Sequence, residues 1–196
     1  NAKHLTISLG KGLDKQQAEL SATMEAIELF SLENLEQGAI NGSYKTLIKR
    51  YPVIDPQALN TSRFKKNVRE VKFNWIKCEL IKSSETAYIP FEAASLDSTC
   101  RKACFSYFQV STNGMGAATD KLTALNHAIM ELLERKRFHD WCLLNETERS
   151  KSVIDLSACS SVKLKKLIRQ TQKAGFNLIV WNISGEGELP VVYCEL

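Results

Sequence analysis

The sequence predicts a mixed α/β (α+β) fold built around a duplicated strand–turn–helix unit. Stretches with the alternation typical of strands and stretches with the periodicity typical of helices follow one another along all 196 residues. Residues 10–28 also resemble residues 116–134 without a gap. A chain of this length is large enough for one good core and short for two domains. We therefore expect a single domain over residues 1–196.

The two similar stretches superpose at a constant offset of 106 positions. The shift places Gly10, Asp14, Lys15, Ala18, Ala22, Met24, Glu25 and Glu28 on Gly116, Asp120, Lys121, Ala124, Ala128, Met130, Glu131 and Glu134. Self-similarity of this kind indicates duplicated structure. The alternative is a chance similarity between two helices rich in alanine and glutamate.

The first half of the chain is predicted from alternation, capping residues and turn signals. The expected elements are, in order, a strand at 5–9, a helix capped by Asp14, a turn at Asn41-Gly42, a short helix at 43–50, and a hairpin of strands at 71–82 and 86–89. Loops are expected at 55–67 and 93–101. The first helix is apolar nearly all round, which predicts burial on most of its sides.

The second half repeats the strand, turn and helix and then adds further elements. The expected elements are a strand at 104–111, a helix capped by Asp120 that runs to about residue 144, an amphipathic helix at 160–173, and strands at 177–183 and 190–194. Gly175 stands where a helix commonly ends in a left-handed residue. The helix after Asp120 is also apolar on most sides, so we expect it to be buried.

Two pairs of glutamates lie on these long helices. Glu25 and Glu28 are three residues apart and share one face of the first helix, as Glu131 and Glu134 do on the second. Clustered carboxylates need a counter-charge, most simply divalent cations, and Mg²⁺ combines oxygen ligands with phosphates. We therefore expect the pairs to face each other across a cleft, with Arg135 beside a phosphate. The alternative is that each pair lies on a solvated stripe of its helix.

Two groups of residues match the signatures of a known family. The first group is Gly10-Lys11-Gly12 followed by Ser21, Glu25 and Glu28, and the second is Ser111-x-Asn113-Gly114-x-Gly116-Ala117 followed by Glu131, Glu134 and Arg135. Weaker stretches at Trp75, Ile89-Pro90 and Leu189-Pro190 agree in order. The chain therefore resembles the YcaO domain family over essentially its whole length. It corresponds to the amino-terminal and middle part of that longer domain, so we expect a YcaO-like fold that is incomplete at its C-terminal end.

The resemblance implies ATP- and Mg²⁺-dependent activation of a backbone amide in a peptide or protein substrate. In the family, a nucleophile attacks the carbonyl, and the amide oxygen is phosphorylated and leaves as phosphate. The products include azolines, thioamides and amidines, and another branch is an accessory factor for methylthiolation of a ribosomal protein. Matched position by position, Glu25, Glu28, Glu131 and Glu134 resemble the Mg²⁺ ligands, and Lys11, Ser21 and Arg135 resemble further nucleotide contacts. No Walker A sequence occurs, so a P-loop does not hold the phosphates.

Three positions depart from the family pattern. Thr119 and Thr123 stand where the family commonly has an asparagine and a glutamate, and Leu29 stands where an arginine usually follows the first glutamate pair. Because the number of charged ligands influences affinity at a metal site, these changes predict weaker metal and ATP binding. They leave a second hypothesis open, namely a catalytically decayed scaffold or a peptide-binding or regulatory protein.

Composition narrows the class of protein further. The net charge of +4 is modest, and the basic clusters at 63–66 and 163–169 are expected to be solvated faces, not nucleic-acid sites. No apolar run is long enough to span a bilayer and no signal peptide is evident, so we expect a cytoplasmic protein with six reduced cysteines and no zinc site. His127 is expected in the core and His139 on a helix surface. The resemblance adds a leader-peptide-binding or E1-like partner protein, and a homodimer is left open.

Overall fold

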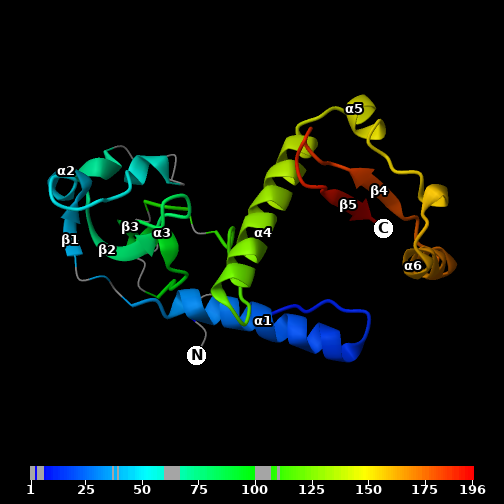
Figure 1. The fold of residues 1–196 in the computed structure, drawn as a ribbon, viewed down its shortest axis with the longest axis horizontal. Helices are drawn as coiled ribbons and strands as arrows, with labels where there is room; N and C mark the ends of the chain where they lie inside the picture. Colours follow the sequence, from blue (N-terminus) through cyan, green and yellow to red (C-terminus); the bar gives the residue numbers. More distant parts are fainter. Residues whose placement is uncertain are drawn as a thin grey trace. The chain divides into compact units, whose positions relative to one another are not determined.

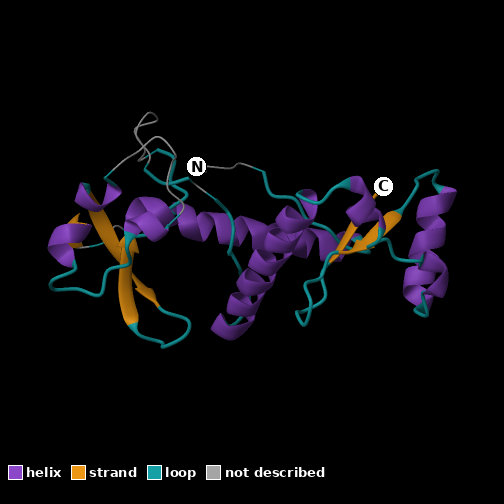
Figure 2. Ribbon diagram, turned by 90° about the horizontal axis from the view of Figure 1, so that it is seen from above, coloured by secondary structure: helices purple, strands orange, loops and turns teal. Residues whose placement is uncertain are grey.

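The structure is a computed structural model that describes residues 3, 7–36, 38, 40–59, 67–99, 107–109 and 111–196. The described residues form six α-helices and two small antiparallel sheets, which confirms the predicted mixed α/β class (Figures 1 and 2). The chain divides into two compact units, residues 1–124 and 125–196. Within the described part of the chain, no helix has the length and apolar character needed to cross a bilayer.

The first unit is built on a three-stranded sheet with the strand order β1-β2-β3. Its elements are α1 (Lys15–Glu33), β1 (Ile40–Ser43), α2 (Tyr44–Leu47), β2 (Lys72–Glu79), β3 (Thr86–Pro90) and α3 (Phe91–Ala94), with single 3₁₀ turns at Pro56–Ala58 and Val68–Glu70. In the antiparallel register, Trp75 lies opposite Ile40 on one side and Pro90 on the other. The predicted hairpin of β2 and β3 is therefore confirmed.

The core of the first unit is aromatic. Trp75 is completely buried, and its indole Nε1 donates a hydrogen bond to the Gly42 carbonyl at 2.9 Å. Phe73 is 2% exposed and packs edge-on against Tyr107, with ring centroids 5.6 Å apart. Buried aromatic pairs in such offset arrangements add to the stabilisation from burial. Phe108 joins the same cluster, which brings residues from distant parts of the sequence onto one face of the sheet.

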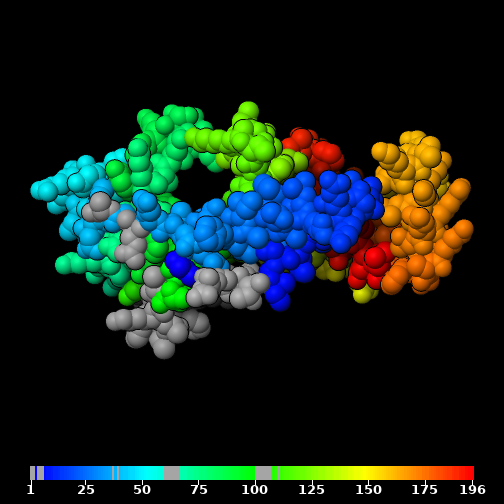
Figure 3. All heavy atoms as spheres, turned by 90° about the horizontal axis from the view of Figure 1, so that it is seen from below, coloured from blue at the N-terminus to red at the C-terminus, as the bar shows by residue number. Residues whose placement is uncertain are grey.

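Helix α1 begins where the sequence predicts but is less buried than expected. Asp14 caps it by accepting a hydrogen bond from the Gln17 amide at 2.9 Å. Its buried residues are Leu29 and Glu33, whereas Leu20 is 63% and Phe30 is 66% exposed. The prediction of burial on most sides is wrong for this helix. The physical reason is that α1 is held by loop contacts, such as the hydrogen bond from the Leu96 N–H to the Leu32 carbonyl at 3.1 Å. Figure 3 shows the atoms of this helix at the surface.

The second unit combines most of α4 with a two-stranded sheet. Its elements are α4 (Lys121–Cys142), which begins in the first unit, α5 (Glu146–Ser150), α6 (Val162–Lys173), β4 (Ile179–Asn182) and β5 (Val192–Glu195), with a 3₁₀ turn at Leu156–Ala158. The two strands pair antiparallel. Their core is formed by Trp141, Trp181, Ile183 and Val191, and the two indoles lie 5.3 Å apart. Trp141 is the only buried residue of α4, so the predicted burial of this helix on most sides is also wrong.

Several predicted boundaries are confirmed and others are corrected. Helix α6 ends in a Schellman motif, because Gly175 has φ +87° and the Phe176 amide donates to the Thr171 carbonyl. Residues 7–9 have irregular backbone and not the predicted strand, and α3 occupies the start of the predicted loop at 93–101. Predictions for residues 5–6, most of the strand at 104–111, and Cys100 and Cys104 lie outside the described residues.

The starts of the two long helices share one capping geometry. Asp120 caps α4 by accepting from the Thr123 amide at 2.9 Å, as Asp14 does for α1. The Thr123 hydroxyl donates to the second oxygen of Asp120 at 2.7 Å. These bonds, first the backbone one and then the hydroxyl, lower the pKa of Asp120 below its ordinary value.

The first prediction concerns the core. Replacing Trp75 by alanine is expected to lower the free energy of unfolding of the first unit by about 3–5 kcal/mol, because a fully buried indole is lost. Ile81, which is 65% exposed, provides the control, since its replacement by alanine removes little buried surface. Urea unfolding followed by far-ultraviolet circular dichroism measures both. Equal effects of the two substitutions would contradict the assigned core.

The second prediction concerns pH. Because the folded-state pKa of Asp120 lies below the ordinary 3.8, its contribution to stability is present above that value. The contribution is lost as the pH falls through the folded pKa. Asparagine also caps helices but does not titrate, so the wild type should lose stability relative to Asp120→Asn only under strongly acidic conditions. Unfolding free energies of both proteins across a pH series test this, and parallel profiles would refute it.

Candidate functional site

The loop of the first signature, Gly10-Lys11-Gly12, lies directly on α1. A Cβ atom added to Gly10 would come 1.8 Å from the Ala18 carbonyl oxygen and 2.5 Å from the Ala22 backbone nitrogen. A Cβ at Gly12 would come 2.5 Å from the Ala18 nitrogen. No side chain fits at these distances, so the glycines are needed for the loop to approach the helix. The Gly-x-Gly pattern therefore has a structural cause in the contact with α1.

Glu25 and Glu28 of α1 each hold a backbone amide of a loop. Glu25 accepts a hydrogen bond from the Leu9 N–H, next to Gly10. Glu28 accepts from the Ala117 N–H at 2.8 Å, although the two residues are 89 positions apart in the sequence. Each bond to a carboxylate is charge-assisted and thus stronger than a bond between neutral groups. Helix α1 is therefore joined through Glu25 to the loop at Gly10 and through Glu28 to the loop at Gly116.

A cavity of about 500 Å³ opens between α1, α3 and the second signature loop. Its lining residues are Glu28, Ser31, Leu32, Ile89, Ala93, Ala94, Ser111, Asn113, Gly114, Met115, Gly116 and Ala117. Gly114 has φ +77°, a conformation that favours glycine and turns the loop around the cavity. The cavity therefore combines one carboxylate with a loop rich in backbone groups. Its volume lies within the range of small-molecule sites.

The remaining predicted residues of the first unit lie on the same helix or its loop. Ser21 is half-buried on α1, one turn before Glu25. Lys11 is exposed in the loop between the two glycines. The structure thus places Lys11, Ser21, Glu25 and Glu28 on one helix and the loop that packs against it.

The predicted residues of the second unit lie on α4. Arg135 forms an ion pair with Glu131, one turn earlier, at 2.6 Å between nitrogen and oxygen. Glu134 is exposed. His127 is exposed as well, so the prediction of a core histidine is wrong, whereas His139 lies on the helix surface as expected. The meeting of these acidic residues with Glu25 and Glu28 stays a prediction.

A second glycine loop closes onto α4. A Cβ added to Gly185 would come 2.4 Å from Nη2 of Arg137. The guanidinium donates from Nε to Glu188 at 2.7 Å, which lowers the pKa of Glu188 and raises that of Arg137. Arg137 therefore anchors the loop of the predicted Gly185-x-Gly187 motif to the helix that carries Glu131 and Glu134. Each glutamate helix is packed against a glycine-containing loop of its own unit.

The residues of α1 fit a magnesium ion and a nucleotide by their chemistry. Mg²⁺ is commonly bound by one or two carboxylates, with water and phosphate oxygens completing the octahedron. Glu25 and Glu28 supply that number, and a carboxylate has lone pairs for a ligand besides the amide it accepts from. Within the described residues, no group of three or more His, Cys, Asp or Glu side chains is arranged to hold a metal ion. When bound, the ion would neutralise phosphate charge and polarise phosphorus.

Two of the three departures from the family pattern have structural roles here. Leu29 is only 6% exposed and belongs to the buried side of α1. Thr123 supplies its amide and hydroxyl to the Asp120 cap. Thr119 is exposed just before that cap. Leu29 therefore serves packing and Thr123 serves capping in this chain.

Some cavity residues were not found by sequence reasoning. Ser31 lies three positions after Glu28, on the same face of the helix, so helical spacing alone could have identified it. Ala93 and Ala94 carry no polar group, and the sequence offers no signal that they line the cavity. Ala117 belongs to the second signature, but the sequence could not identify its amide as the donor to Glu28, because any residue type offers a backbone N–H.

A third prediction follows from the contact between Gly10 and α1. Gly10→Ala should cost about 1–3 kcal/mol of stability, because the new methyl group would overlap backbone atoms that cannot rotate away. Leu13→Ala alters the same loop at a side chain that is 79% exposed and serves as the control. Amide hydrogen exchange of Leu9 should accelerate in the glycine variant alone. Unchanged exchange would contradict the packing of this loop.

Comparison with known proteins gives concordant matches. The family model described as YcaO cyclodehydratase, ATP- and Mg²⁺-binding, matches residues 9–196. An uncharacterized protein of Methanothermobacter thermautotrophicus is 24% identical over 182 residues, which is 93% of this chain and 45% of that protein. An uncharacterized protein in the tfuA 3′ region of Rhizobium leguminosarum bv. trifolii is also 24% identical, over 97% of this chain and 45% of that protein. The chain spans less than half the length of these curated relatives.

Solved structures show the same fold. A heterocyclase in complex with substrate and cofactor superposes with a TM-score of 0.72 and 17% identity over 92% of this chain and 26% of its own. YcaO from Methanopyrus kandleri bound with AMPPCP and Mg²⁺ superposes with a TM-score of 0.59 and 18% identity, over 88% of this chain and 41% of its own. A chain of the E. coli microcin synthetase McbBCD complex superposes with a TM-score of 0.67 and 14% identity, over 99% of this chain and 55% of its own. Together with the family match over residues 9–196, these similarities show that the chain belongs to the YcaO family.

Proposed function

We propose that this chain forms part of an ATP- and Mg²⁺-dependent YcaO enzyme that activates a backbone amide of a peptide. The observation that carries the proposal is the hydrogen bond from Ala117 to Glu28 at the edge of a cavity of about 500 Å³. This bond joins the helix that carries Glu25 and Glu28 to the loop that contains Gly114 and Gly116, and both belong to the first unit. Membership of the family described as ATP- and Mg²⁺-binding supports the same conclusion.

The residues of α1 and α4 take defined roles in this proposal. Glu25 and Glu28 would ligate Mg²⁺, and Glu131 and Glu134 would complete the acidic set from α4. Lys11 and Ser21 would contact the nucleotide from the loop and helix of the first unit. Arg135 would face phosphate oxygens, because a guanidinium matches their geometry and keeps its charge.

The chemistry proposed is phosphorylation of an amide oxygen by ATP. A nucleophile of the substrate adds to the amide carbonyl, the resulting oxygen takes the γ-phosphoryl group, and phosphate then leaves. An azoline forms when the nucleophile is a neighbouring side chain, and a thioamide forms when it is a sulfur donor. Positioning and charge neutralisation carry most of the catalysis of phosphoryl transfer. The carboxylates and cations named above would supply both.

The substrate and partners are proposed by analogy with the solved relatives. One is a heterocyclase in complex with its substrate, and another is part of the McbBCD complex. We therefore propose a peptide or protein substrate here and a partner protein that selects it. A leader-peptide-binding or E1-like partner is consistent with this arrangement.

A catalytically decayed scaffold is the alternative function. It is favoured by Leu29, which is buried in α1, and by Thr123, whose hydroxyl is engaged in the Asp120 cap. Neither position supplies the charged group common in the family. Such a protein would bind a peptide or partner without consuming ATP.

The fourth prediction tests the enzyme hypothesis. Glu28→Gln should lower Mg²⁺-dependent phosphate release from ATP by at least about a hundredfold in the full-length protein with a peptide substrate, because a metal ligand is lost. Glu19→Gln removes the same charge from an exposed position of α1 and is the matched control. Release of phosphate can be followed with a coupled colorimetric assay. Wild-type turnover in Glu28→Gln would overturn the assignment of this residue.

A further inference from the structure

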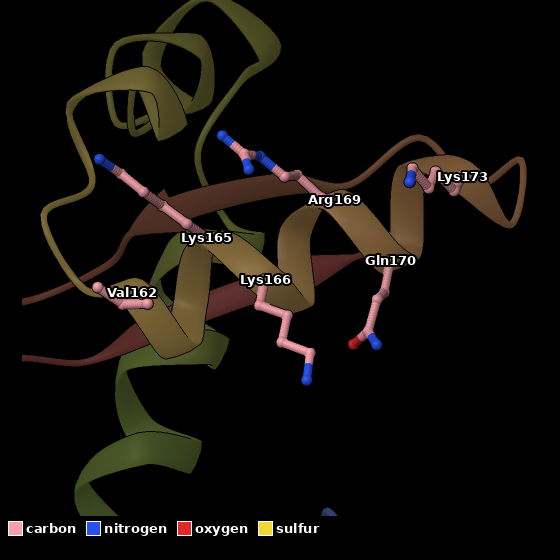
Figure 4. A pocket seen from close by; sticks show the side chains of 6 residues that line it. All are labelled: Val162, Lys165, Lys166, Arg169, Gln170 and Lys173. Carbon is pink, nitrogen blue, oxygen red and sulfur yellow. The ribbon is translucent and has the colours of Figure 1, made fainter.

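Helix α6 carries a concentrated positive charge that the proposed reaction does not use. Five of its twelve residues are lysine or arginine and none is acidic. In Figure 4, Lys165 and Arg169 extend in one direction from the helix, whereas Lys166 and Gln170 extend in the opposite direction. Together with Val162 and Lys173, these residues line a shallow hollow. The hollow has a volume of about 420 Å³.

The charge of α6 is not compensated within the described chain. Lys163, Lys165, Lys166, Arg169 and Lys173 are all exposed, and no described acidic side chain forms an ion pair with any of them. Several of these cations lie three or four positions apart, where like charges repel. The first turn also contains no acidic residue, so cations stand near the positive end of the helix dipole. The repulsion between these cations weakens the helix, and a bound anion would reduce it.

The cationic face is the outer face of its helix. Ile168 and Thr171 are the least exposed residues of α6 and lie on the opposite side from Lys166 and Lys173. In the space-filling view, the orange atoms of α6 lie at the surface of the second unit (Figure 3). The cations are therefore available to a partner.

The surroundings of α6 select the class of partner. The other residues of the unit 125–196 carry nine acidic and five basic side chains, which would repel a long polyanion beyond the helix. Helix α6 has no aromatic residue on which bases could stack. The apolar residues Leu164 and Leu167 are 52% and 44% exposed and lie on the same side of the helix as Ile168 and Thr171, away from Lys165 and Arg169. A short acidic peptide fits the cationic side, because it is too short to meet the acidic surroundings and needs no aromatic residue for stacking.

We propose that the exposed face of α6 is a docking surface for a short acidic peptide segment of a partner protein. Twelve helical residues extend about 18 Å, which matches five or six residues of extended peptide at about 3.3 Å each. Carboxylates at that spacing meet Lys165, Arg169 and Lys173 in turn. The surface does not depend on ATP binding or on the glutamates of α1 and α4.

Binding of a fluorescein-labelled acidic peptide of about ten residues, measured by fluorescence anisotropy on the 196-residue chain, tests the proposal. The peptide should bind, and its affinity should fall as salt is raised. The double variant Lys165→Gln/Arg169→Gln should weaken binding by about tenfold or more. Lys49→Gln/Arg50→Gln removes one lysine and one arginine from exposed positions elsewhere and should bind as the wild type does.

Several results would overturn the proposal. They are absence of peptide binding, equal weakening by both double variants, and tighter binding of either a single-stranded oligonucleotide of the same charge or vesicles containing anionic lipid. The last two would assign the surface to nucleic acid or membrane. Far-ultraviolet circular dichroism of both variants should match the wild type, because the substituted side chains are exposed and glutamine is compatible with a helix.

Discussion

The hydrogen bond between the Glu28 carboxylate and the Ala117 amide sets the position of α1 against the loop that leads to α4. A half-buried carboxylate needs such a donor, because without one it would be desolvated at a large cost. The bond holds this carboxylate among the residues that line a cavity of about 500 Å³. The same helix receives the Gly10 loop through Glu25. Both loops of the first unit are thus ordered around α1.

Loop packing around the helices explains the glycines of the signatures. Gly10 and Gly12 allow backbone to lie directly on α1, and Gly185 allows it to lie on the guanidinium of Arg137. These contacts require the absence of a side chain, and they bring polar backbone groups close to each glutamate helix. A binding site for an anionic ligand benefits from such groups, because backbone amides are rigid donors. The glycines of the motif are therefore explained by close packing of the loops, whether or not they also contact a ligand.

Local features were predictable from the sequence, whereas burial was not. The caps at Asp14 and Asp120, the hairpin of β2 and β3 and the glycine end of α6 follow from interactions within a few residues. The exposure of His127 depends on what packs against α4, which helical periodicity does not reveal. Among the candidate site residues, Glu25 and Glu28 could be proposed from their spacing and from the family resemblance. Their amide partners could not, since any residue offers a backbone N–H.

In the proposed function, magnesium and a triphosphate bind at Glu25 and Glu28 of α1. Isothermal calorimetry of Mg²⁺·AMPPCP added to the full-length protein and to its Glu28→Gln variant tests this directly. We predict a saturable heat for the wild type, and for the variant an affinity at least about tenfold lower. A wild type that gives no heat, or a variant that binds with unchanged affinity, would contradict the central claim.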